Sequence, residues 1–224
     1  MSNITVIIPV HEVQNNMSDL LKKSVNSVAS QKTKPKELLI VHSNNEELKK
    51  FLTEFDFGET KDYVRLVEND GDTSFQGQIN YGVEKTTTPY FTFLEYDDEL
   101  STIWLESGED YIKHYPEVGV YLPIVFESNS EGQFLSFTNE SIWAKDFSEE
   151  MGYIDNNTLQ HYANFNFDGM IVKKEVVEEF GCLKSNIELT FTYEFLLRMT
   201  YNSVPVMVIP KLGYKHTNSR EGSL

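Results

Sequence analysis

Apolar residues in the first hundred positions follow two alternating periodicities. Four short apolar runs predict buried strands, and the three segments between them have apolar positions at helical spacing. The strands are expected at Ile4–Val10, Glu37–Val41, Tyr63–Val67 and Pro89–Leu94, and the helices at residues 18–28, 46–55 and 74–84. Strands that alternate with helices predict a mostly parallel sheet covered on both faces. The fold class is therefore α/β, and a ligand is expected at the carboxyl ends of the strands.

The pattern is looser after residue 99. Helices are expected at residues 104–114, 174–180 and 192–201, and strands at residues 118–126, 170–173 and 204–209. Residues 127–168 are rich in polar and aromatic residues and predict no clear element. The length of 224 residues fits one large domain, with or without a subdomain.

Composition and charge narrow the classes of partner. The chain is 40% hydrophobic and has no apolar stretch near the roughly 20 residues that a membrane span needs. Its single cysteine, Cys182, fits a reducing compartment, so a cytoplasmic location is expected. A net charge of −16 argues against nucleic acid and against anionic membranes as partners. A phosphorylated ligand would therefore need positive charge from another source, such as a bound cation.

An acidic cluster follows the fourth predicted strand. Glu95-Tyr96-Asp97-Asp98 places three carboxylates within four residues, at the sheet edge where a ligand is expected. Packed carboxylates repel one another, and a divalent cation removes that cost. Mg²⁺ and Mn²⁺ prefer such oxygen ligands and often share them with substrate phosphates. The stretch therefore indicates a metal site for a phosphorylated substrate, with a solvated acidic turn as the alternative.

Four motifs, in their order and spacing, give the chain a resemblance over nearly its whole length. They are Val6-Ile-Ile-Pro-Val-His11, Asn80-Tyr-Gly82 ahead of Thr88–Asp98, Gly181-Cys-Leu183 followed by Tyr193–Arg198, and Tyr214–Ser223. Together they resemble the GT-A-fold glycosyltransferases, and family 2 most closely. The resemblance implies a Rossmann-like GT-A sheet flanked by helices with a smaller acceptor-side subdomain. Residues 1–99 would form the nucleotide-sugar-binding half and residues 100–224 the acceptor-binding half, with a tail at 212–224 that closes the site.

The reaction implied by the resemblance is transfer of a sugar from a nucleotide-diphosphate donor to an acceptor hydroxyl, with inversion. The metal would be Mn²⁺ or Mg²⁺, which stabilises the charge on the leaving diphosphate. Asp97 or Asp98 would bind the metal and the other would hold the ribose or the metal's waters, with Glu95 and His216 as further ligands. His216 is alternatively a surface residue of the tail. The aromatic residues between 134 and 167 would form the side that binds a sugar or glycan acceptor, unless they belong to the core.

The resemblance also implies a set of nucleotide-binding residues. They are Pro9, Val10, His11, Ser43, Asn69, Gly71, Asn80, Tyr96 and Asp97. His11 stands where the family has a base-stacking Tyr, and Asn80 could equally have the structural role of pinning a loop. A UDP-sugar is favoured as the donor. However, His42-Ser43-Asn44-Asn45 replaces the family's Asp-Asp-x-Ser, so the preference for a particular base does not carry over.

The general base is the largest departure from the family. An inverting transferase needs a carboxylate to deprotonate the acceptor, and the family supplies it where this chain has Phe191-Thr192. Glu194 and Glu188 are the nearby candidates, although Glu194 is also well placed to favour a helix N-terminus.

Two other functions stay open. One is a catalytically degenerate GT-A-fold protein that binds a sugar nucleotide or has a structural or assembly role. The other is a nucleotidyltransferase, which is disfavoured because no Gly-rich phosphate loop follows the first strand. The sequence leaves the donor sugar, acceptor, linkage, pathway and oligomeric state open.

Overall fold

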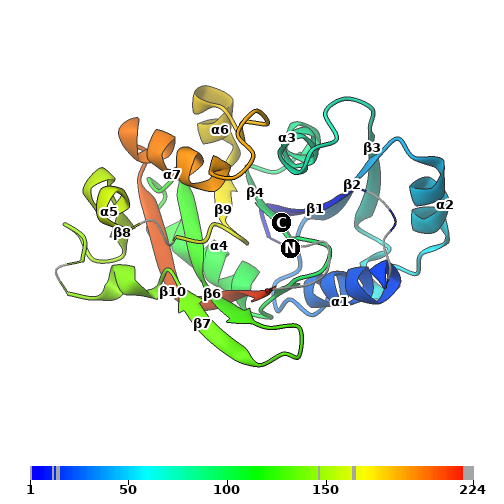
Figure 1. The fold of residues 1–224 in the computed structure, drawn as a ribbon, viewed down its shortest axis with the longest axis horizontal. Coiled ribbons are helices and arrows are strands. Elements are labelled where there is room, and N and C mark those ends of the chain that lie inside the picture. The colour runs from blue at the N-terminus through cyan, green and yellow to red at the C-terminus, as the bar shows by residue number, and fades with distance from the viewer. Residues whose placement is uncertain (1, 12, 14–15, 146, 163–164, 219–224) are drawn as a thin grey trace.

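One continuous sheet organises the protein. The computed structural model describes residues 2–11, 13, 16–145, 147–162 and 165–218. Within them the sheet has the strand order β3-β2-β1-β4-β9-β6-β10-β5, with β7 paired to β6 and β8 paired to β10 (Figure 1). This arrangement confirms the predicted α/β class and the sheet flanked by helices.

The first half of the chain forms the parallel part of the sheet. Its elements are β1 (Ile4–Val10), α1 (Met17–Ala29), β2 (Glu37–Ser43), α2 (Glu46–Glu54), a short 3₁₀ turn (Gly58–Thr60), β3 (Val64–Asn69), α3 (Phe75–Lys85) and β4 (Tyr90–Phe93). Strand β1 pairs in parallel with β2 and β4, and β2 pairs in parallel with β3. The predicted helices and strands agree with these bounds to within a few residues.

The second half mixes strand directions. Its elements are β5 (Glu99–Leu100), α4 (Trp104–His114), β6 (Val120–Ser128), β7 (Phe134–Thr138), a 3₁₀ turn (Glu140–Trp143), β8 (Tyr153–Ile154), α5 (Asn156–His161), β9 (Ile171–Lys173), α6 (Lys174–Phe180), α7 (Phe191–Tyr201) and β10 (Val206–Thr217). Strand β9 joins the two halves because it pairs antiparallel with both β4 and β6. Strand β10 runs parallel to β6.

Two features of this half differ from the expectation. The hairpin strand β7, the short β8 and helix α5 lie in the segment where the sequence predicts no clear element. Strand β10 continues to Thr217, whereas the predicted strand ends at 209. Its pairing with β6 shifts register between Val208 and Tyr214, a stretch that contains Pro210 and Gly213. Such irregularities let a strand accommodate Pro and Gly, which otherwise indicate a loop.

Hydrophobic cores cover both faces of the sheet. Alternate residues of β1 point to opposite sides, so Ile4, Val6 and Ile8 belong to one core and Ile7 to the other. The first core includes residues of α1, α2 and α4, and the second includes residues of α3, α5, α6 and α7. Figure 1 shows α3, α6 and α7 on one side of the sheet and α1 on the other. The ends of the strands are therefore held rigidly between two helical layers.

The described helices were compared with what a membrane span requires. None of them combines the length and the apolar character that crossing a bilayer requires.

Helix α3 packs closely on the sheet at Gly82. A Cβ atom there would lie 2.7 Å from Ile7 Cγ2 and 3.0 Å from Val41 Cγ2, both of which are side chains of the central strands. Both strand residues are fully buried, so they have little room to move.

We expect Gly82→Ala to lower the free energy of unfolding by about 1–2 kcal/mol, because overpacking outweighs the better helix propensity of Ala. Urea denaturation followed by circular dichroism would measure this. Glu84→Ala on the exposed side of the same helix is the control and should change stability by less than about 0.5 kcal/mol. A Gly82→Ala protein as stable as the parent would contradict the close approach.

Candidate functional site

A cavity of about 460 Å³ opens beside the carboxyl ends of β4 and β6. Residues from six parts of the chain line it: the start of α3, the segment after β4, the β6–β7 hairpin, the segment before β9, the region that leads into α7, and β10. They are Phe75, Glu95, Glu127, Thr138, Phe165, Asn166, Phe167, Asp168, Glu188, Leu189, Phe191, Thr192 and His216. The position agrees with the rule that open α/β sheets bind ligands at the ends of their strands.

Four of the side chains at this place could hold a metal ion together. Glu95, Asp98, Asp168 and His216 each offer a ligand atom, and these atoms all lie within 4.8 Å of one another. Three carboxylates and an imidazole form a donor set that suits Mn²⁺ and similar divalent ions. No described residue donates a hydrogen bond to the Glu95 carboxylate. Its oxygens can therefore be satisfied by a cation, which is a second reason why the cluster fits one.

Asp98 has a different environment from the other acids. Its side chain is only 1% exposed. It accepts hydrogen bonds from the Tyr214 hydroxyl at 3.0 Å, from His216 Nδ1 at 2.9 Å and from the Thr217 backbone N–H at 3.1 Å. Nδ1 of His216 also lies 3.7 Å from Asp168 Oδ2, so this edge of the ring faces the acidic cluster. Metal-binding histidines are commonly oriented by a carboxylate in this way.

The closeness of these groups perturbs their affinity for protons. Burial, together with the charges of Asp168, Asp98 and Asp97, raises the pKa of Glu95 well above its usual range. Burial also raises the pKa of Asp168 to about 6, although the charge of His216 works in the opposite direction. Burial alone would lower the pKa of His216, but the hydrogen bond and charge of Asp98, with the charges of Asp168 and Glu95, raise it to about 9. A divalent cation would relieve this accumulation of negative charge.

Asp168 is a member of the cluster that the sequence reasoning missed. Asn139, whose φ is 72°, fixes the chain before it: its amide donates to the carbonyls of Pro123 and Asn166 and accepts from the Asn166 N–H. Gly169 follows with φ at 71°, where a Cβ would lie 2.6 Å from the Tyr214 ring. The one signal in the sequence is an Asp-Gly pair directly before an apolar strand.

Asp97 lies apart from the four-residue cluster. It lines a neighbouring pocket of about 270 Å³, with Lys23, Lys215 and Thr217 among the other lining residues. By resemblance, Asp97 and Asp98 are alternatives for binding the metal. The structure brings Asp98 into the cluster as the partner of His216, and the role of Asp97, like that of the adjacent Tyr96, stays a prediction.

The residues expected to bind the nucleotide lie at the ends of β1 and β2. Pro9 and Val10 are the last residues of β1, and the Ser43 hydroxyl donates to the His11 carbonyl at 2.7 Å. The His11 ring lies with Nδ1 3.0 Å from the Thr73 carbonyl and its centroid 6.2 Å from that of Phe75. The structure therefore brings His11 to the start of α3, beside the cavity wall.

The other nucleotide candidates are Asn69, Gly71 and Asn80, and all three take part in hydrogen bonds that hold loops. The Asn69 amide donates to the Asp72 carbonyl and accepts from the Gly71 N–H, which shapes the turn before α3. Asn80 donates to the Leu183 carbonyl at 2.7 Å and accepts from the Leu183 N–H at 3.0 Å. Asn80 thus has the loop-pinning role that the sequence analysis left open, and a contact with nucleotide stays a prediction for all three residues.

Of the two candidate bases, only Glu188 lines the cavity. It is exposed, and it follows a segment that α3 holds through Asn80 and through Gln76, which donates to the Ile187 carbonyl at 3.0 Å. Glu194 instead forms ion pairs with Arg198 at 2.7 Å and Lys184 at 3.0 Å and faces a separate pocket between α5 and α7. Burial would raise the pKa of Glu194, but these two partners lower it. The geometry therefore favours Glu188.

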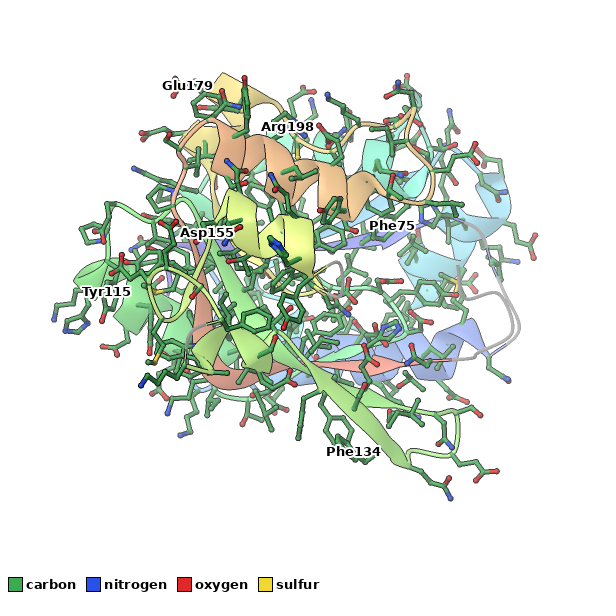
Figure 2. The ribbon with its side chains drawn as sticks, turned by 60° about the vertical axis from the view of Figure 1, so that its left-hand side comes forward. Phe75, Tyr115, Phe134, Asp155, Glu179 and Arg198 are labelled. Atoms are coloured by element: carbon green, nitrogen blue, oxygen red, sulfur yellow. The ribbon has the colours of Figure 1, made fainter. Side chains whose placement is uncertain are left out.

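Of the aromatic residues expected on the acceptor side, Trp143, Phe147 and Tyr153 pack against the two cores, as the alternative had it. Four others form two groups. Phe165 and Phe167 line the cavity, and Phe167 packs with Phe191 at a centroid distance of 5.6 Å. Phe134 and Phe137 instead pack with Phe126 and are about half exposed. Figure 2 shows Phe134 near the tip of the β6–β7 hairpin, far from Phe75 in that view. Only the first group can contact a ligand in the cavity.

Comparison with known proteins places the chain in a family. The model of glycosyl transferase family 2 matches residues 5–181, which is more than half of the chain. The chain therefore belongs to glycosyltransferase family 2, and the GT-A fold expected from the motifs is confirmed.

Individual relatives are distant. The chain is 22% identical over 200 residues to a teichoic acid poly(glycerol phosphate) polymerase of Staphylococcus epidermidis, a match that covers 88% of this chain and 26% of that protein. Crystal structures of S. aureus TarS 1–349 with UDP and with UDP-GlcNAc both have a TM-score of 0.66, with 15% and 17% identity. These matches cover 96% and 98% of this chain but 60% and 59% of TarS 1–349. At this identity the structures establish the fold.

The perturbed pKa of His216 makes the stability of the metal-free protein depend on pH. Its folded pKa of about 9 exceeds the unfolded value of 6.5. A raised pKa contributes stability that is present below the unfolded value and is lost as the pH rises through the folded value. We expect the urea midpoint in EDTA to fall between pH 6.5 and 9. In His216→Ala this fall should be much smaller, whereas His114→Gln on the exposed face of α4 should retain it. An equal fall in His216→Ala would contradict the assignment.

Proposed function

We propose that the protein is a metal-dependent glycosyltransferase that moves a sugar from a nucleotide-diphosphate donor to an acceptor hydroxyl, with inversion. The observation that carries this proposal is the cluster of Glu95, Asp98, Asp168 and His216 beside a cavity that also holds Glu188. Membership of glycosyltransferase family 2 supports the reaction class. Because the chain spans only part of its relatives, the activity itself is a proposal.

The proposed metal ligands are Glu95, Asp168 and His216, with Asp98 orienting the imidazole. The presence of a histidine favours Mn²⁺ over Mg²⁺, since Mg²⁺ prefers an all-oxygen set. A bound cation would stabilise the negative charge that develops on the leaving diphosphate. The chain's own contribution is to fix the ligand atoms before a donor arrives, through the contacts of Asp98 with β10 and of Asn139 with the segment before Asp168.

The proposed donor is a UDP-sugar held by the first half of the chain, residues 1–99. TarS has been crystallised with UDP and with UDP-GlcNAc, which supports a uridine nucleotide on the same fold. His11, at the end of β1, is the candidate to stack on the base, with the Phe75 ring near it. Tyr96 and Asp97 would contact the ribose or the metal's waters. The second half, residues 100–224, would supply the acceptor side. Its tail at residues 212–224, of which 219–224 lie outside the described residues, would close the site.

The proposed general base is Glu188. A base must reach the acceptor hydroxyl, and Glu188 lies in the wall of the cavity whereas Glu194 is paired with two cations outside it. The base position of the family, Phe191-Thr192, also lines the cavity. Moving the carboxylate from the start of α7 to the preceding loop would keep it on the same wall.

A second candidate function is a degenerate GT-A-fold protein that binds a sugar nucleotide without transfer. The replacement of the family's base by Phe191-Thr192 is the observation that favours it. Measuring UDP release from UDP-sugars with Mn²⁺ separates the two, because only an enzyme turns the donor over.

Cys182 fits the reducing environment of the cytoplasm, which is the location we propose.

Neutralising the proposed metal ligands should weaken metal binding. We expect Glu95→Gln and Asp168→Asn each to raise the Mn²⁺ dissociation constant at least tenfold, because each loses one carboxylate ligand. Electron paramagnetic resonance titration of free Mn²⁺ measures this without turnover. Glu140→Gln, an exposed charge outside the cavity, is the control. If Asp97→Asn weakened binding while Glu95→Gln and Asp168→Asn did not, the ligand assignment would be wrong.

Removing the proposed base should affect turnover and leave binding intact. We expect Glu188→Gln to lower kcat for sugar transfer about 100-fold, within the range for loss of a general base, with little change in UDP or Mn²⁺ affinity. Glu194→Gln should leave kcat within a few-fold and lower thermal stability, because it loses its ion pairs with Arg198 and Lys184. Transfer that persists in Glu188→Gln and disappears in folded Glu194→Gln would reverse the assignment.

A further inference from the structure

The cavity carries more negative charge than a metal site requires. Four of its lining residues are carboxylates, and none of its described lining residues is Lys or Arg. Two of these acids, Glu95 and Asp168, belong to the cluster that a divalent cation would neutralise. The other two, Glu127 and Glu188, lie outside that cluster and remain as negative charges in the cavity wall.

The partners of Glu127 leave its charge in place. Its Oε2 atom accepts hydrogen bonds from the Ser136 hydroxyl at 2.7 Å and from the Asn218 amide at 3.4 Å, which are both neutral donors. Neither Glu127 nor Glu188 forms an ion pair with any residue in the described part of the chain. The lysines Lys23 and Lys215 line the neighbouring pocket that contains Asp97, and Lys215 is paired with Glu99 at 3.0 Å.

Aromatic rings form a second part of the cavity wall. Phe75, Phe165, Phe167 and Phe191 all line it, and Phe75 and Phe167 each pack against both Phe191 and Phe93. Rings fixed in this way present an apolar surface that suits the C–H face of a sugar. Carboxylates are acceptor-only groups, so they pair with hydroxyl donors and not with phosphate oxygens.

We propose that the acceptor is a neutral glycan and not a phosphate-containing polymer, and that Glu127 selects it by accepting a hydrogen bond from a sugar hydroxyl. This inference rests on the proposed transferase function. A donor diphosphate adds negative charge beside the cation, so an anionic acceptor would meet repulsion from the diphosphate, from Glu127 and from Glu188. A neutral sugar meets hydroxyl acceptors and aromatic faces instead. The S. epidermidis relative is named for a poly(glycerol phosphate) product, and the charges of this cavity argue for a different acceptor class.

The test measures acceptor binding separately from turnover. The full chain, with Mn²⁺ and UDP, would be applied to an array of neutral oligosaccharides, their sulfated or phosphorylated counterparts and poly(glycerol phosphate). Hits would be titrated by isothermal calorimetry. We expect neutral glycans to bind at least tenfold more tightly than their phosphorylated counterparts. Glu127→Gln should reduce this preference at least threefold, while Glu140→Gln should leave it unchanged. UDP release from UDP-sugars, measured in parallel, tests the transferase function itself.

Each result decides the inference. Binding confined to neutral glycans, with a preference that falls in Glu127→Gln, supports it even if the parallel assay shows no UDP release, in which case only the transferase function fails. Equal or tighter binding of phosphorylated glycans or poly(glycerol phosphate) overturns it. An array on which no neutral glycan is retained overturns it as well. A preference that is unchanged in Glu127→Gln removes the role assigned to that residue.

Discussion

The buried carboxylate of Asp98 is the interaction on which the site depends. It lies in the segment between β4 and β5, directly before Glu99, and accepts hydrogen bonds from Tyr214, His216 and Thr217, so it holds β10 against the segment that follows a central strand. The Tyr214 hydroxyl in turn accepts from the Glu95 N–H, which closes the arrangement. An unpaired carboxylate at this depth would be costly. The hydrogen bonds that offset this cost also set the position of every cluster member except Asp168.

Asp168 reaches the same place through a second set of constraints. Asn139 follows the β6–β7 hairpin and holds the segment before Asp168 with its side-chain amide. The Trp104 indole N–H donates to the Gly169 carbonyl at 2.8 Å on the other side. Two contacts far apart in the sequence therefore bring Asp168 to the cluster as its fourth member. Burial at this place, together with the close approach of the carboxylates, raises the pKa values of Glu95 and Asp168.

The sequence predicts the first half of the fold well because its signal is local. Ile4–Val10 and the three strands that follow have apolar runs, and the helices between them have helical spacing, so the α/β class and the sheet edge where Glu95 lies can be inferred. His216 was also identified, from the resemblance of the tail. Asp168 could not be found in this way, because its place depends on Asn139 and Gly169 and not on a pattern around it. Strand β7 was missed since its aromatic residues are largely exposed and resemble a loop.

The separation of Glu188 from Glu194 shows how a site can keep its shape when a family residue is lost. Arg198 donates to the carbonyls of Phe180, Gly181 and Cys182, and it also pairs with Glu194. Glu194, at the start of α7, therefore helps to hold the preceding loop in place. On the other side of that loop, Gln76 and Asn80 hold its backbone at Ile187 and Leu183. These hydrogen bonds from both sides restrict the loop that carries Glu188. The same contacts keep Glu188 on the cavity wall, where it forms no ion pair with a described residue. The proposed selection among acceptors depends on this charge.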